Sequence, residues 1–137
     1  MAWNNVAQAM VRSPLKVTSI KSLQEEIYVK LLDVVSKGTR KISISLSGIT
    51  PENFEAVTAE ISLTLQELIS QLQAIDSQVA QEAARKYMEA AAALDSIVGS
   101  AYPVGPRKIK LVKSLYKEIY DKIYMKIFQS DWRRSWS

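Results

Sequence analysis

The side chains of this sequence that could do chemistry are lysines, arginines, tyrosines and carboxylates, because it contains no cysteine and no histidine. Their absence removes thiolate nucleophiles, the usual zinc ligands and the commonest general base. The four glycines are isolated and form no phosphate-binding loop, and no serine lies in a nucleophile-elbow pattern. The sequence therefore predicts a protein that is not an enzyme and that has no cofactor and no metal.

The charges are arranged in three blocks. Residues 1–41 carry a net charge of +4, residues 42–100 carry −6, and residues 101–137 carry +6. Such an asymmetry indicates either a polyanionic partner for the two basic ends or head-to-tail association between copies of the chain.

The basic N-terminal block supplies the candidate nucleic-acid contacts. A phosphate backbone needs only positive charge within reach, so no strict motif is expected. The alternative is an ordinary solvated helix face, which the nearby Glu25 and Glu26 support. No cluster of Asn, Gln and Arg on one helix face is suited to base edges, so we expect binding to be independent of sequence. The candidate contacts are Arg12, Lys16, Lys21, Lys30, Lys37, Arg40 and Lys41.

Aromatic residues near the C-terminus are the candidate interface residues. Tyr116, Tyr120 and Tyr124 recur every four residues, a row that either stacks on bases or, as we prefer, forms the edge of a helix packed on a neighbour. Trp132 and Trp136 enclose two arginines, a composition enriched at protein–protein hot spots. This pair could also clamp phosphates or belong to a disordered basic tail, but we expect burial at a contact.

The elements that position these residues are predicted to be helices. A short helix over residues 3–12 should end at Ser13-Pro14, because proline disfavours helix at the preceding residue. A second helix should run from about Ser19 to Lys37, with Gly38 at its C-terminus. Residues 1–41 are thus predicted to form a basic two-helix arm.

The rest of the chain is predicted to be a connector, a bundle and a tail. Strict alternation over residues 41–47 favours a strand that has no partner within the chain. Residues 42–49 are therefore assigned as a connector, which is either extended with one apolar edge or paired as a strand with another copy. The helical bundle spans 50–129. It starts at Thr50-Pro51 with long central helices. Residues 51–98 form either one continuous helix or, as we prefer, a hairpin that turns near Asp76. The last helix begins near Pro106. Residues 130–137 form a basic aromatic tail.

The fold class is therefore all-α, a basic N-terminal two-helix arm followed by a helical bundle. No apolar run is long enough to span a membrane. The first residues lack the pattern of a signal peptide, which predicts an intracellular, cytoplasmic origin.

Taken together, the charge layout and helix order resemble the major capsid (coat) proteins of archaeal filamentous and rod-shaped viruses with linear double-stranded DNA. The arm would be residues 1–41 and the bundle residues 50–129, with loops at 48–51 and 100–103 similar to bundle loops in that family. The acidic middle block departs from a simple DNA-coating surface. It would have to face outward or meet basic surfaces of other subunits.

The resemblance implies that the arm wraps DNA, that the bundle forms the outer wall and that the protein is located in a virion. The function we expect is a structural, self-assembling subunit that coats nucleic acid, with double-stranded DNA favoured, in a helical filament. Its partners would be nucleic acid and copies of itself or a paralogous subunit. The alternatives are a small helical adaptor that binds a protein partner and a non-enzymatic DNA-binding regulator.

Overall fold

The computed structural model describes the backbone of residues 2–127 and the side chains of residues 23 and 25–127. Within this range the chain is helical and contains no strand, which confirms the all-α class. The elements are α1 (Ala2–Ser47), α2 (Phe54–Gln73), α3 (Gln78–Val98), α4 (Pro106–Glu118) and a π-helical segment, η1 (Ile119–Tyr124).

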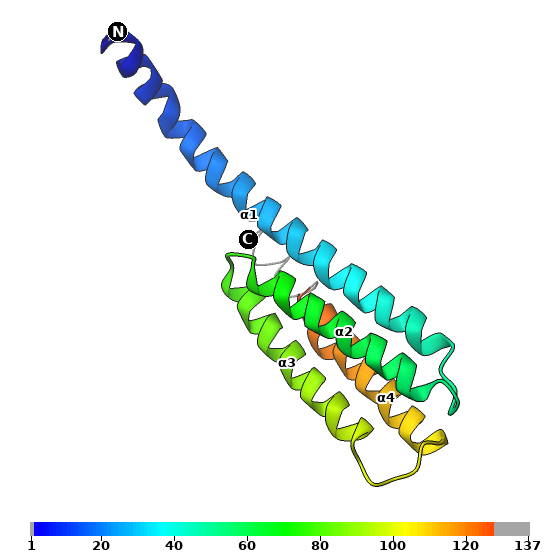
Figure 1. The fold of residues 1–137 in the computed structure, drawn as a ribbon. Helices are drawn as coiled ribbons and strands as arrows, with labels where there is room; N and C mark the ends of the chain where they lie inside the picture. Colours follow the sequence, from blue (N-terminus) through cyan, green and yellow to red (C-terminus); the bar gives the residue numbers. More distant parts are fainter. Residues whose placement is uncertain (1, 128–137) are drawn as a thin grey trace.

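The second half of α1 forms an antiparallel four-helix bundle with α2, α3 and α4–η1 (Figure 1). Each helix runs opposite to the one before it, and η1 returns along α1 to close the bundle. One continuous apolar core lies between the helices, and its largest fully buried side chains include Tyr87, Phe54, Leu31 and Leu65. Burial of such apolar surface is the main force that holds the helices together.

The helix α1 has two parts with different surroundings. Residues 2–27, which we call the projecting half, extend beyond the bundle with no other described helix beside them (Figure 1), except that Ile27 at the junction packs against the core. Residues 28–47, the packed half, bury Tyr28, Leu31, Val35, Ile42 and Leu46. This spacing of three, four and seven residues places the buried side chains on one face of the helix. The predicted arm of residues 1–41 therefore differs from the structure, in which the chain joins the core at about residue 28.

The predicted break in the arm is also absent, because α1 is a single helix of 46 residues. It continues through Pro14, whose nitrogen cannot donate the helical hydrogen bond and whose position inside a helix costs about 3 kcal/mol. It also continues through Gly38, which was predicted to end a helix. A Cβ at Gly38 would lie 2.7 Å from Leu68 Cδ1, so this glycine allows α1 and α2 to approach closely.

The predicted strand at residues 41–47 is wrong as well. Ile42 and Leu46, four residues apart, are buried, whereas Ile44 between them is 64% exposed. The alternation of isoleucine, leucine and serine thus fits a helical stripe with one additional exposed isoleucine. The Ser47 hydroxyl donates a hydrogen bond to the Ile44 carbonyl oxygen (2.7 Å), as serines in a last helical turn often do.

The helix α2 begins one turn later than the predicted start at Thr50-Pro51, at Phe54 with Asn53 as its N-cap residue. The Thr50 amide donates to Asn53 Oδ1 (2.6 Å) and the Asn53 amide donates to Thr50 Oγ1 (3.3 Å), a reciprocal capping box one turn before α2. The chain reverses between Gln73 and Gln78, so the range 51–98 is two helices with the predicted turn near Asp76.

The last helix begins at Pro106, as predicted, and changes to π-helix at Ile119, which was not predicted. Lys108 near its start is only 3% exposed. Its Nζ donates to the carbonyl oxygens of Val98 (3.1 Å) and Ser100 (3.2 Å), at the C-terminus of α3. A cation at this position satisfies carbonyl groups that have no partner in the helix and complements the helix dipole. Lys108 therefore joins the start of α4 to the end of α3.

Candidate nucleic-acid interface

Three of the predicted phosphate contacts, Arg12, Lys16 and Lys21, belong to the projecting half of α1. Their side chains lie outside the described residues. The backbone nevertheless fixes their register. Residues 12 and 16 are one turn apart and therefore share a face of the helix. Residues 2–22 contain these three cations and no acidic residue.

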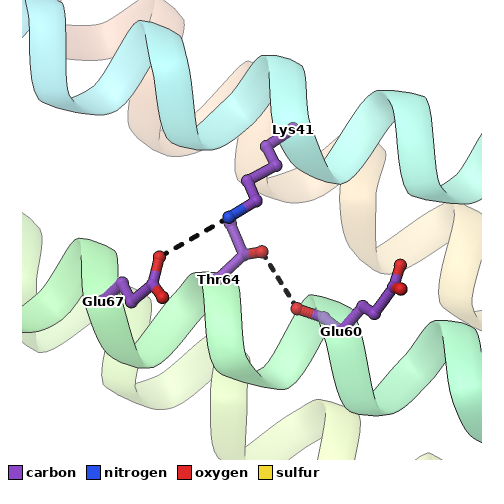
Figure 2. Close-up of polar contacts among 4 residues, drawn as sticks. All are labelled: Lys41, Glu60, Thr64 and Glu67. Carbon is purple, nitrogen blue, oxygen red and sulfur yellow. Dashed lines mark hydrogen bonds and ion pairs between the residues drawn. The ribbon is translucent and has the colours of Figure 1, made fainter.

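The four other predicted contacts lie on the packed half, where two of them have acidic partners. Lys37 Nζ is 3.2 Å from Asp33 Oδ2, one turn earlier on α1. Lys41 Nζ is 3.6 Å from Glu67 Oε2 on α2, next to Thr64, whose hydroxyl donates to the Glu60 carbonyl oxygen (2.9 Å; Figure 2). Both pairs are more than half exposed, so each contributes little to stability.

Lys30 and Arg40 complete the predicted set. Both are exposed, and neither forms an ion pair with any other residue that the structure describes. Lys30 has Glu25, Glu26 and Asp33 around it, so the local charge there is mixed. Arg40 is four residues after Ser36 and lies on the same side of α1, which faces η1.

The tyrosine row lies on this side of the bundle, where α4–η1 meets α1. The ring centroids of Tyr116 and Tyr120 are 6.3 Å apart, and those of Tyr120 and Tyr124 are 5.4 Å apart. Tyr116 and Tyr124 pack against the core, and Tyr124 Oη accepts a hydrogen bond from Ser36 Oγ (3.3 Å). Tyr120 is 38% exposed. Two of the rings thus contribute to packing, and the middle ring is presented to solvent.

Lysines lie beside the tyrosine row on the same face of α4. Two rows of side chains run along this face at intervals of three or four residues. One row is Lys110, Lys113 and Lys117, and the other is Tyr116 and Tyr120. Because α1 and η1 are antiparallel and Ser36 bonds Tyr124, one turn along each helix places Arg40 opposite Tyr120. We call this surface the basic ridge. Its members are Arg40, Lys110, Lys113, Lys117 and Tyr120.

The basic ridge contains no carboxylate partner, since none of its four cations is ion-paired within the described range. Of the residues in the basic ridge, only Arg40 belongs to the set of nucleic-acid contacts predicted from the sequence. The spacing of the three lysines was visible in the sequence. The register that places Arg40 level with Tyr120 was not, because it depends on how α1 and η1 pack. The ridge offers two features of nucleic-acid-binding surfaces. Cations without ion-pair partners can contact phosphates, and an exposed aromatic ring can stack on the bases of a single strand.

A groove of about 610 Å³ lies on the other side of α4–η1, where it faces α3. Its floor is apolar and includes Ala90 and Ala93, and its rim carries both signs of charge. The charged rim residues are Lys86, Glu89, Glu118, Asp121, Lys122 and Lys126. The Lys122–Glu118 pair, at 3.9 Å, neutralises part of this rim. Because three carboxylates balance three lysines, the rim lacks the net positive charge that favours a phosphate backbone.

Among the described residues, Tyr87 is a buried group whose pKa is clearly shifted. Burial raises the pKa of Tyr87 from 10.0 to about 12, against a smaller lowering effect from the nearby Thr39 hydroxyl. Neither hydroxyl has a hydrogen-bond partner with good geometry. Tyr87 is completely buried and belongs to the apolar core, so its ring contributes to packing.

Two further searches of the described residues bear on function. No three carboxylates lie close enough together to hold a metal ion. None of the helices is both long and apolar enough to cross a membrane. The predicted interface residues Trp132 and Trp136 lie outside the described residues. No protein-family model, curated protein or solved structure matches this chain.

Proposed function

We propose that this protein is a structural, self-assembling subunit that coats nucleic acid, with double-stranded DNA favoured, in a helical filament. The observation that carries the proposal is the projecting half of α1. It is a basic helix, about 39 Å long at 1.5 Å per residue, that leaves the bundle and, apart from Ile27 at the junction, has no other described helix beside it. An isolated helix in water is marginal, and Pro14 weakens this one further. A partner outside the chain would supply the missing stabilisation.

The charge of the projecting half supports a polyanionic partner. It carries Arg12, Lys16 and Lys21 with no acidic residue before Glu25. The basic ridge on the bundle adds a second group of unpaired cations. By contrast, α2 carries Glu55, Glu60 and Glu67 and no base. This distribution would place nucleic acid at the arm and the ridge, and would turn the acidic surface toward solvent or toward basic surfaces of other copies.

The resemblance to coat proteins of archaeal filamentous viruses extends the proposal to a virion. In that setting the packed bundle would form the wall of the filament, and the projecting halves would follow the DNA inside it. Phosphate contact alone is required of such a subunit, because a coat must bind every sequence of its genome.

The salt dependence of binding to a duplex tests the nucleic-acid part of the proposal. Binding is measured by fluorescence anisotropy over a range of salt concentrations, using two duplexes of equal length and unrelated sequence. The variant Arg12→Gln/Lys16→Gln/Lys21→Gln should lower the log–log salt slope by about 3 units, since each phosphate contact contributes about 0.9. The two duplexes should bind alike.

A matched control has the same change in net charge on the acidic side of the molecule. Arg85→Gln/Lys86→Gln/Lys122→Gln should leave the slope within about 1 unit of wild type, because these cations lie among carboxylates. The ridge variant Lys110→Gln/Lys113→Gln/Lys117→Gln reports whether the bundle contributes further contacts. Equal loss in the arm and control variants would mean that net charge alone drives binding. Absence of binding at low salt would overturn the proposal in favour of an adaptor for a protein partner.

A further inference from the structure

The projecting half of α1 and the groove between α3 and α4–η1 have complementary shapes and chemistry. We propose that the projecting half of one copy docks in this groove on a second copy. The inference rests on the proposed self-assembly and specifies the contact that produces it.

The groove has the structure of a helix-binding site. Ala90 and Ala93 on α3 are one turn apart, and small side chains at this spacing let another helix approach closely. Leu115, Ile119 and Ile123 on α4–η1 provide the opposite, apolar wall. The π-helical turns of η1 supply part of this wall, and π-helical segments occur often at functional sites.

The rim of the groove carries no net charge. Glu89, Glu118 and Asp121 are balanced by Lys86, Lys122 and Lys126, so the rim lacks the excess of cations that a nucleic-acid backbone needs and does not repel a basic helix. The projecting half is a basic helix, with no acidic residue over residues 2–22. The mixed sign of the rim also agrees with an interface, since rims of protein–protein interfaces are polar and the centres apolar.

The projecting half has the amphipathic pattern that such a groove needs. Trp3, Val6, Met10 and Val17 follow each other at intervals of three, four and seven residues, which places these positions on one face of the helix. Their span is about 21 Å, close to the roughly 17 Å between residues 115 and 126 along the groove wall. Positions 12 and 16 fall on the opposite face, whereas position 21, one turn after Val17, falls on the apolar face beyond this span.

The docked helix must come from another copy. The projecting half continues directly into the packed half, which lies against α2 and η1 on the side away from the α3–α4 groove. A continuous helix cannot fold back around the bundle to reach this groove. The contact therefore joins two different surfaces of two copies. Such head-to-tail contacts generate rings or open helical filaments.

Cysteine cross-linking tests the contact directly, because the chain has no cysteine of its own. The full-length double variant Met10→Cys/Ala93→Cys is oxidised without nucleic acid and run on a non-reducing gel. We expect a ladder of covalent oligomers, because docking brings the two positions within disulfide distance. Val6→Cys and Val17→Cys in place of Met10→Cys cover a small shift in register. Mixing the two single variants should give a dimer that contains one of each.

The control keeps the arm cysteine and moves the second one. Leu63 is 59% exposed on α2, away from the groove, and Met10→Cys/Leu63→Cys should give no ladder. Two results would overturn this contact and leave the proposed assembly standing. One is an equal ladder in both cysteine pairs. The other is a wild type that assembles while none of the arm cysteines cross-links to Ala93→Cys. A wild type that sediments as a monomer, with and without DNA, would overturn both. An intramolecular bond in Ala93→Cys/Trp132→Cys would assign the groove to the C-terminal segment instead and overturn the inference.

Discussion

The two halves of α1 share one helix and one kind of pattern but have different surroundings. In the packed half, Leu31, Val35, Ile42 and Leu46 face α2 and η1 and are almost completely buried. In the projecting half, Trp3, Val6, Met10 and Val17 follow a similar spacing with no other helix beside the backbone (Figure 1). Among the described helices, only the packed half has partners that cover its apolar face.

This difference indicates how the molecule divides its tasks. The packed half stabilises the subunit, and its cations Lys37 and Lys41 are already paired with carboxylates. The projecting half contributes little to the fold and keeps both an apolar and a basic face for other molecules. Regions with few buried contacts supply the binding segments of many proteins. In the arrangement proposed above, self-assembly would use the face of Trp3, Val6, Met10 and Val17, and phosphate contact would use the face of Arg12 and Lys16.

The largest expected effect comes from truncating one leucine in each half. Leu31→Ala should lower the free energy of unfolding by about 2–5 kcal/mol, because Leu31 is 1% exposed and its loss leaves a cavity. Leu15→Ala in the projecting half should change it by less than about 0.5 kcal/mol in dispersed protein. Urea unfolding followed by circular dichroism measures both. Similar losses in the two variants would contradict the division of α1.

Loss of stability in alkali gives a smaller effect that is specific to the packed half. The Tyr87 hydroxyl is buried beside Thr39 of this half, and its pKa is raised to about 12. Below pH 10 the proton is bound in both folded and unfolded chains. Between pH 10 and 12 only the unfolded chain releases it, so stability falls as pH rises, by at most about 1.4 kcal/mol per pH unit.

The variant Tyr87→Phe isolates this effect. It removes the titrating group and also the unsatisfied hydroxyl, so the fall in stability between pH 10 and 12 should be shallower than in wild type by roughly 2–3 kcal/mol over the window. The other tyrosines and the lysines titrate in both proteins and cancel in the difference. Identical pH profiles of the unfolding free energy would show that the Tyr87 side chain is not desolvated.

The sequence predicts those parts of this fold that depend on local signals. Pro106 marks the start of α4, the turn near Asp76 divides α2 from α3, and Thr50-Pro51 marks the start of α2 to within one turn, because caps and proline act over that length of chain. Gly38 was misinterpreted for the same reason. Its role is a close approach to Leu68, thirty residues away, and no local rule contains that information.

The candidate interface was predictable to a similar extent. The cations of α1 and the tyrosine row follow from residue type and spacing. The pair Lys37–Asp33 could also have been inferred, since the two residues are one turn apart. The Lys41–Glu67 pair, the basic ridge and the α3–α4 groove could not, because each depends on the register between helices. The Ser36–Tyr124 hydrogen bond, which sets one such register, joins residues 88 positions apart.

The smallest expected effect concerns Lys41, whose pairing with Glu67 joins the packed half to α2 (Figure 2). Lys41→Gln should change the free energy of unfolding by less than about 1 kcal/mol, because both side chains are more than half exposed and well solvated. Lys108→Gln is the reference. Its buried Nζ donates to two carbonyl oxygens, and its removal should cost about 1–3 kcal/mol. If the two variants lose the same stability, Lys41 is part of the contact between α1 and α2 and is not available to a phosphate. If Lys41→Gln is neutral, its ammonium group can leave Glu67 at little cost, and the packed half then keeps one more cation for nucleic acid than its ion pairs suggest.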